Sequence, residues 1–238
     1  MIKNLFTGLL LLCGLSSLAN ADNLTQHPGV LQAYWLPVFN DDGSQAEPEL
    51  LLRFLDTSNA QKKIVVDLYK ERNADGPQNS VFGKPEDIAR IRHDFATIPD
   101  NFFRFKEGHI EQNGVLTQSG FFSQVECDHR YYYAKFVAFK PVTKSGDYTQ
   151  EIGELAGCGG QPWQVGYQVN PAKGKVYLKA RPDMNSQNLV PLTTDDSVIK
   201  IRTIDAEWLY VAVYDAGKPD SMSDRRGYIR KSALTNWY

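Results

Sequence analysis

The chain has 238 residues, with 26 Lys or Arg against 28 Asp or Glu and a formal net charge of -2. Hydrophobic residues make up 42% of the chain and charged residues 23%, which is ordinary for globular domains and excludes wholesale disorder, collagen-like repeats and a multi-span membrane protein. Because this charge balance offers no general attraction for phosphate backbones, we expect no nucleic-acid partner. The length is enough for two domains that each bury a core.

The first segment, residues 1–21, has the features of a secretory signal peptide. Lys3 gives it a positive start, residues 5–15 are uncharged and mostly apolar, and Ala19-Asn20-Ala21 supplies the small residues that signal peptidase needs. The apolar stretch is too short to span about 30 Å of hydrocarbon as a stable helix. We therefore predict cleavage after Ala21, a periplasmic location and no permanent membrane anchor. The alternative, lipidation of Cys13, is disfavoured by the large leucine before it.

Removal of the signal peptide leaves two cysteines, Cys127 and Cys158, in an oxidising compartment. We predict a disulfide between them, which stabilises by roughly 3 to 4 kcal/mol if loop-closure entropy is its main contribution. The alternative makes Cys127 a nucleophile assisted by His129, because residues two positions apart on a strand point to the same face. A nucleophile needs an accessible, unoxidised sulfur, so the disulfide is the favoured interpretation.

From about residue 22 to 160 the chain is predicted to form an α+β domain made mainly of antiparallel strands. Apolar runs rich in β-branched or aromatic residues predict strands at 34–39, 50–56, 63–70, 121–125 and 130–139. The segments between the first three runs are rich in Asn, Asp, Gly and Ser, which favour turns. Asn113-Gly114, the strongest short hairpin signal, predicts a tight turn within 109–116.

One clear helix is predicted at about 85–96. Pro85 suits the first helical position, and the two acidic residues after it lie at the positive end of the helix dipole. Ile88, Ile91 and Phe95 recur with helical spacing, so one face of the helix is apolar. The aromatic cluster after the helix consists of Phe102, Phe103 and Phe105. We expect this cluster to pack in a hydrophobic core rather than to form a recognition surface.

The last third of the chain carries the pattern of a small β-barrel. Its features are Val176 to Pro182, Leu189 to Leu192, Asp196 to Ile201, Trp208 at the start of a strand, and Gly227-Tyr228-Ile229 with a closing Leu234. This order resembles a bacterial SH3 domain. The resemblance implies an SH3-like β-barrel over 172–238, after a polar loop from Thr143 to Gln161 and with a mobile distal loop from Asp215 to Arg226. The whole chain is thus expected to be mainly β.

The resemblance also implies a function of recognition without chemistry. Bacterial SH3 domains outside the cytoplasm bind peptidoglycan peptides or act as protein-binding modules, and a shallow groove of aromatic rings suits an extended peptide. By position the candidate ligand-binding residues are Tyr177, Trp208, Tyr210 and Tyr228. The alternative interpretation is that these aromatic rings fill the interior of the barrel.

The sequence carries no recognisable catalytic or metal-binding motif. The four histidines are dispersed, no Cys-x-x-Cys pair occurs, and neither a Gly-rich phosphate loop nor a Gly-x-Ser-x-Gly elbow is present, so we expect no metal and no cofactor. A pair of carboxylates facing each other across a sugar would still make a glycan hydrolase. The carboxylates available for such a pair include Glu107, Glu111, Glu126, Asp128, Glu151 and Glu154.

These observations predict an exported, periplasmic, non-catalytic binding protein. Its expected partner is a peptidoglycan peptide or a secreted or periplasmic protein, recognised through the SH3-like domain. Two alternatives stay open. One is an immunity protein that occludes a secreted cell-wall-degrading toxin, since an acidic protein suits a basic target. The other is a cell-wall hydrolase with an unrecognised carboxylate site.

Overall fold

The computed structural model describes residues 23–236 except 43, 60–63, 74–75, 79, 127–128, 143–164 and 219. Within these residues lie a closed five-stranded barrel, a seven-stranded sheet, a two-stranded ribbon and two α-helices. The mainly β class predicted from the sequence is therefore confirmed. The predicted signal peptide and both cysteines of the predicted disulfide, Cys127 and Cys158, lie outside the described residues.

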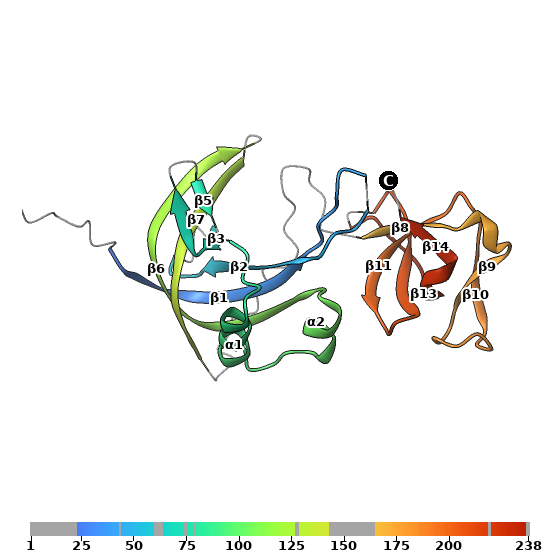
Figure 1. Cartoon of the computed structure of the whole chain (residues 1–238), viewed down its shortest axis with the longest axis horizontal. Helices are drawn as coiled ribbons and strands as arrows, with labels where there is room; N and C mark the ends of the chain where they lie inside the picture. Colours follow the sequence, from blue (N-terminus) through green and yellow to red (C-terminus); the bar gives the residue numbers. More distant parts are fainter. Residues whose placement is uncertain are drawn as a thin grey trace, which may run out of the picture.

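The first half of the chain forms the barrel (Figure 1). Its strands are β1 (Thr25–Leu36), β2 (Glu49–Asp56), β3 (Ile64–Tyr69), β6 (His109–Glu126) and β7 (His129–Pro141). They close in the order β1-β2-β3-β7-β6, and all neighbours are antiparallel except β3 and β7. Between β3 and β6 lie β4 (Glu71–Asn73), β5 (Gly76–Gln78), α1 (Pro85–Asp94) and α2 (Asp100–Phe105).

Alternate residues of the barrel strands build one hydrophobic core. The inward residues of β1 and β2 are Leu31, Ala33, Trp35, Leu50, Leu52 and Phe54. Their spacing of two follows from the strand geometry, which points successive side chains to opposite faces. The helices add Ile91, Phe95 and Phe102 to the same cluster. The barrel and its two helices therefore share a single core.

Helix α1 spans Pro85–Asp94, within the predicted range, and its chain becomes extended at Phe95. Its first turn is fixed by Asp87, whose carboxylate accepts a hydrogen bond from the Lys84 N–H at 3.2 Å and pairs with Lys70 Nζ at 2.9 Å. These contacts tie the start of the helix to the residue that follows β3. The anionic side chain also lies where the helix dipole favours it.

The aromatic cluster after α1 lies on the short helix α2, whose six residues are too few to show a helical period in the sequence. Phe102 is 2% exposed and belongs to the barrel core. Phe103 packs edge-on against Trp35, with ring centroids 6.5 Å apart. Phe105 is half-buried, and the Arg104 guanidinium lies 4.9 Å from its ring centroid. Core packing thus accounts for most of the cluster, as expected.

The predicted hairpin at Asn113-Gly114 is wrong, because both residues lie inside the long strand β6. Gly114 pairs with Gly29 on one side and Pro141 on the other. A Cβ atom there would lie 2.3 Å from Phe139 Cζ and 2.5 Å from the Lys140 carbonyl oxygen. The glycine therefore serves a close approach of β7 rather than a turn.

Replacing Gly114 tests this explanation. We expect Gly114→Ala to lower the free energy of unfolding by roughly 1 to 3 kcal/mol, because the added methyl forces the Phe139 ring or the strand to move. Gly83→Ala is the matched control, since its nearest neighbour would be Val81 Cγ1 at 3.7 Å; its cost should stay within about 0.5 kcal/mol. Urea unfolding measures both, and equal costs would contradict the close-packing explanation.

The second half of the described chain forms the seven-stranded sheet. Its strands are β8 (Gly166–Val169), β9 (Val176–Lys179), β10 (Asn188–Leu192), β11 (Ser197–Thr203), β12 (Trp208–Tyr214), β13 (Met222–Arg230) and β14 (Leu234–Asn236). Two short 3-10 turns, η1 (Pro171–Lys173) and η2 (Lys231–Ala233), precede β9 and β14. The order is β10-β9-β13-β12-β11-β8-β14, and the sheet has an apolar cluster of its own. It begins at β8, earlier than residue 172.

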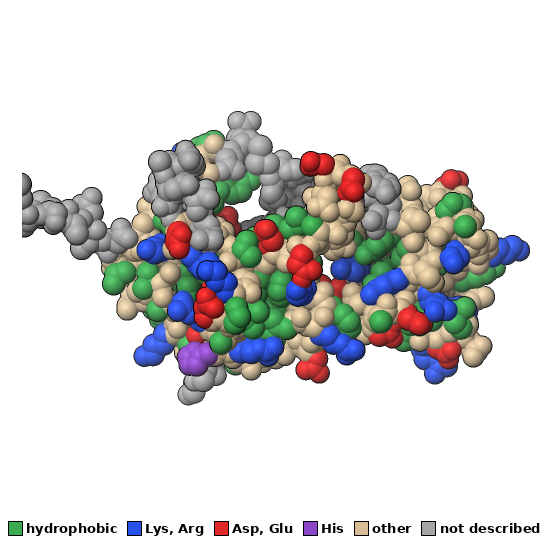
Figure 2. All heavy atoms as spheres, in the orientation of Figure 1, with side chains coloured by type: hydrophobic (Ala, Val, Ile, Leu, Met, Phe, Trp, Pro, Cys, Tyr) green, Lys and Arg blue, Asp and Glu red, His purple; other side chains and the backbone are tan. Residues whose placement is uncertain are grey.

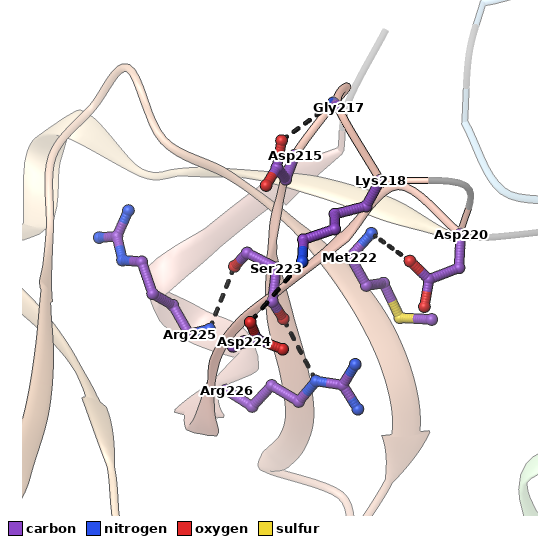
Figure 3. A network of polar contacts seen from close by, with 9 residues as sticks. All are labelled: Asp215, Gly217, Lys218, Asp220, Met222, Ser223, Asp224, Arg225 and Arg226. Carbon is purple, nitrogen blue, oxygen red and sulfur yellow. Dashed lines mark hydrogen bonds and ion pairs between the residues drawn. The ribbon is translucent and has the colours of Figure 1, made fainter.

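The loop expected from Asp215 to Arg226 is shorter than predicted, because β13 begins at Met222. Figure 3 shows how polar contacts tighten the turn, in which Asp215 Oδ1 accepts the Gly217 N–H at 2.9 Å. The Lys218 N–H also donates to the Asp215 carbonyl oxygen, and Ser221 adopts a positive φ of 54°. Asx-type bonds and one left-handed residue close the reversal locally, so the residues after it are free to pair with β12.

One carboxylate joins the barrel to the second sheet. Glu107 lies in the turn between α2 and β6, where Lys106 and Gly108 have positive φ values of 50° and 76°. Its two oxygens accept the Thr203 N–H at 2.6 Å and the Thr203 hydroxyl at 2.8 Å. Lys200 Nζ lies 3.2 Å from the same carboxylate, and both side chains are largely buried. Three donors thus compensate the loss of hydration of one buried anion.

Removing this carboxylate should weaken the whole chain. We expect Glu107→Ala to lower the free energy of unfolding by roughly 2 to 4 kcal/mol, since it leaves Lys200 and the Thr203 N–H without their acceptor. Glu47→Ala is the control, because Glu47 pairs with the neighbouring Lys106 on an exposed surface; it should cost about 1 kcal/mol or less. Calorimetry should also resolve two transitions in Glu107→Ala, and a single unshifted transition would contradict the coupling.

No helix in the part of the chain that the structure describes is long and apolar enough to cross a membrane. On the face that Figure 2 shows, side chains of both charges are scattered over the barrel and the second sheet. This mixed surface agrees with the nearly balanced numbers of acidic and basic residues.

Candidate functional site

Strand alternation gives the second sheet an apolar inner face and an aromatic outer face. On β12, Leu209, Val211 and Val213 belong to the apolar cluster, so the residues between them point the other way. The inner residues of β9 and β13 include Leu178 and Ile229, which are at most 1% exposed. The predicted ligand-binding residues Tyr177, Trp208, Tyr210 and Tyr228 alternate with these inner residues and are not members of the cluster. The sheet therefore brings all four to one face.

The first part of this face is a hollow that we call the aromatic groove. Its lining consists of Lys179, Ala180, Leu189, Ile201, Arg202, Tyr210, Arg226, Gly227 and Tyr228, around a volume of about 460 Å³. Tyr210 and Tyr228 are opposite each other in the β12–β13 ladder, with ring centroids 4.9 Å apart and an interplanar angle of 52°. Tyr228 in turn faces Lys179 across the β13–β9 pair. Tyr210, Tyr228 and Lys179 thus form one continuous row across three neighbouring strands.

Gly227 allows this row to form. A Cβ atom at this position would lie 2.9 Å from both Leu178 Cβ and the Lys179 carbonyl oxygen. Only a residue without a side chain lets β13 approach β9 this closely. The glycine that marked the strand in the sequence therefore sets the distance between Tyr228 and its neighbour on β9.

The aromatic groove is apolar at its floor and basic at its rim. Leu189 and Ile201 are 47% and 37% exposed, which is unusual for large aliphatic side chains. The Arg202 guanidinium lies 5.5 Å from the Tyr210 ring centroid, and Arg226 Nε donates to the Ser223 carbonyl oxygen at 3.2 Å. The lining includes two arginines and one lysine but no carboxylate. The groove is thus suited to apolar groups accompanied by negative charge.

The second part of the face is a hollow that we call the tryptophan pocket. Its lining consists of Lys173, Lys175, Val176, Tyr177, Lys179, Met184, Asn188, Trp208, Ile229, Arg230, Ser232 and Ala233, around a volume of about 400 Å³. Trp208 is only 6% exposed, and Asp205 Oδ1 accepts its backbone N–H at 2.8 Å. Lys179 lines both hollows, so they adjoin at this side chain.

Sequence reasoning identified the aromatic residues of this face but missed its cations. Lys179 follows Tyr177 by two positions on β9, a spacing that could have placed it on the same face. Arg226 precedes Tyr228 by the same two positions on β13. Arg202 carries no such signal, because β11 reaches the groove only through its pairing with β12. The exposure of Leu189 and Ile201 could not be predicted either, because aliphatic residues in strands are usually buried.

The alternative chemistry proposed from the sequence gains no geometric support within the described residues. Glu107 is engaged by Thr203 and Lys200, and Glu111 accepts a hydrogen bond from Gln32 at 2.7 Å. The described residues contain no group of three His, Cys, Asp or Glu side chains that could hold a metal ion. The other candidate carboxylates either lie outside the described residues or have side chains that are not described; these are Glu126, Asp128, Glu151 and Glu154.

Comparison of the chain with protein-family models, curated proteins and solved structures finds no match. The function therefore has to be inferred from the geometry and chemistry of the chain itself.

The loop between β10 and β11 is held in place by Asp196. Its carboxylate accepts the Thr193 N–H at 2.7 Å and the Thr193 hydroxyl at 2.8 Å, and it lies 3.5 Å from Arg225 Nη1. Burial alone would raise the pKa of Asp196, but the hydrogen bonds from Thr193 and the charge of Arg225 outweigh it, so the pKa lies below its usual range. The ionised carboxylate therefore stabilises the fold.

This shift gives stability a defined pH dependence. A carboxylate whose pKa is lowered by folding contributes stability above its unfolded pKa, and that contribution is lost as the pH falls through the folded pKa. We expect Asp196→Asn to be less stable than the parent protein at neutral pH, with the difference shrinking in acid below the unfolded value of 3.8. Thermal unfolding between pH 2 and 7 measures this, with exposed Asp195→Asn as control. A pH-independent difference would contradict the assignment.

Proposed function

We propose that this chain is an exported binding protein that recognises an extended peptide, of the cell wall or of a periplasmic protein, on the outer face of its second sheet. The observation that carries the proposal is the placement of Tyr177, Trp208, Tyr210 and Tyr228 on one face, outside the apolar cluster of that sheet. These aromatic side chains line the aromatic groove and the tryptophan pocket. The signal-peptide features of residues 1–21 are the basis for export.

The topology of the second sheet supports an SH3-like interpretation. Strands β11, β12 and β13 are consecutive antiparallel neighbours, and they are followed by the 3-10 turn η2 and by β14. Strand β14 returns to pair with β8, the first strand of the sheet. A three-stranded meander, a 3-10 turn and a last strand that pairs with the first are what we expect of an SH3-like barrel. A shallow aromatic groove on such a barrel is suited to extended peptides.

The chemistry of the face indicates how such a peptide would be held. Tyrosine rings supply rigid apolar area and a hydroxyl for hydrogen bonding at low entropic cost. The exposed Leu189 and Ile201 add apolar contacts on either side of the tyrosine pair. Because Arg202 and Arg226 stand at the rim without a carboxylate in the lining, acidic peptides are favoured over basic ones.

Replacing Tyr228 tests the groove. We expect Tyr228→Ala to weaken binding by roughly five- to a hundred-fold, the loss of one aromatic contact in a central position. Stability should fall by about 1 kcal/mol or less, because only a cross-strand ring pair is lost. The neighbouring Ile229→Ala is the matched control, since Ile229 is 1% exposed in the core; it should cost about 2 to 5 kcal/mol of stability.

The binding measurements use two probes, sedimentation with purified peptidoglycan and an envelope pull-down with the mature protein. Tyr228→Phe keeps the ring, so weaker binding with unchanged stability would assign the hydroxyl to the ligand. Full affinity of Tyr228→Ala for the partner that these probes return would rule out the groove. Capture of a wall-degrading enzyme whose turnover is then blocked would establish the immunity alternative instead.

A further inference from the structure

The tryptophan pocket concentrates positive charge beyond what a peptide backbone requires. Four cations line it, namely Lys173, Lys175, Lys179 and Arg230, and its lining contains no carboxylate. Lys173 and Lys175 are exposed, and neither side-chain ammonium makes a hydrogen bond or an ion pair with another described residue. The pocket thus offers two lysines whose charge no neighbouring protein group neutralises.

The other two cations are held in fixed positions. Lys179 Nζ donates to the carbonyl oxygens of Met184 at 2.8 Å and Ser186 at 3.2 Å. Arg230 Nη2 donates to Glu207 Oε2 at 2.8 Å, and the Glu207 side chain is 63% exposed. Neutral carbonyls and a solvated carboxylate orient these groups but leave most of their charge available. The cationic rim is therefore preorganised.

Two further donors of the pocket lack an acceptor. The Trp208 indole N–H makes no hydrogen bond to any described residue, and Trp208 lines the pocket. Arg230 Nε is buried without a partner among the described residues. A buried donor without an acceptor is rare in folded proteins because its loss of hydration is costly. A ligand that brings acceptor oxygens into the pocket would offset this cost.

Part of the remaining lining is aliphatic. Val176, Ile229 and Ala233 line the pocket beside the cations. A bare inorganic anion would leave these surfaces in contact with water, whereas a small aliphatic residue that carries a carboxylate would cover them and meet the donors at the same time. The volume of about 400 Å³ is in the range of small-ligand sites.

We propose that the tryptophan pocket binds the terminal carboxylate of a peptide that ends in a small apolar residue. This inference rests on the proposed function, since it makes the pocket the end-anchoring site of the peptide that occupies the aromatic groove. The lysines supply charge, Arg230 and the indole N–H supply directed donors, and the apolar wall selects the last side chain. Specificity for a chain end follows, because an internal residue has no carboxylate to place there.

The test uses N-acetyl-alanyl-alanine, in both enantiomeric forms, as the probe. Binding is followed through the Trp208 indole resonance in ¹H–¹⁵N spectra of the mature protein, with Trp208→Phe used only to assign the signal. We expect a saturable shift for at least one enantiomer, and roughly tenfold weaker binding of its carboxamide, since a charge-assisted hydrogen bond is lost. Equal binding of acid and amide, or no saturable shift, would overturn the proposal.

Variants separate this pocket from the neighbouring groove. The double variant Lys173→Gln/Lys175→Gln should weaken the dipeptide roughly tenfold, and the loss should shrink at high salt. The double variant Arg202→Gln/Arg226→Gln is the matched control, because it removes the same two charges from the lining of the aromatic groove alone, and it should leave the affinity for the dipeptide unchanged. An unaltered affinity in the double lysine variant would overturn the assignment.

Three additional probes identify the source of the anion. N-acetyl-glutamine with a free carboxyl terminus should bind more weakly than the alanine peptide, and the α-amide of N-acetyl-glutamic acid, whose only carboxylate is on the side chain, should bind least. Inorganic phosphate that binds as tightly as the dipeptide would overturn the carboxylate proposal. Tyr228→Ala should retain dipeptide binding, so failure of the groove and failure of the pocket give different results.

Discussion

The carboxylate of Glu107 is the contact on which the arrangement of the chain depends. Glu107 lies in a turn of the barrel domain that contains two residues with positive φ. Its carboxylate accepts two hydrogen bonds from Thr203, the last residue of β11. Thr203 pairs with Leu209, next to Trp208 at the start of β12. The barrel is thus attached to the strand end nearest the tryptophan pocket. Because the anion is buried with three donors, this attachment has a defined geometry rather than the looseness of a surface ion pair.

The outer face of the second sheet follows from a simpler constraint, the period of two along a strand. Aliphatic residues of the core occupy the inner positions of β9, β12 and β13, so the aromatic side chains between them point to the outer face. The same constraint places Lys179 and Arg230 beside them. The same strands therefore supply the core and the candidate site from alternate residues. A substitution on one face of the sheet can then leave the side chains of the other face in place.

Local sequence patterns predicted what is local in the fold. Helix α1 could be located because Pro85 and the spacing of its apolar residues act within a few turns, and most strands follow runs of β-branched residues. The parallel pairing of β3 with β7 could not be predicted, since it joins residues 66 positions apart whose register no local signal specifies. Gly114 was misread because a glycine needed for close packing and one needed for a turn look alike in sequence. Lys179 and Arg226 were missed because basic strand residues are usually solvated, and Arg202 because β11 reaches the groove only through its pairing with β12.

Lys179 stands where the two hollows meet, and it is anchored by two backbone carbonyl oxygens. A peptide long enough to enter both hollows makes its second contact as an intramolecular step, at the high effective concentration that a short tether provides. The free energies of the two weak contacts then add, so their contributions to the association constant multiply. A fragment that fills one hollow alone does not have this advantage, so the proposed peptide site would select its ligand by length as well as by chemistry.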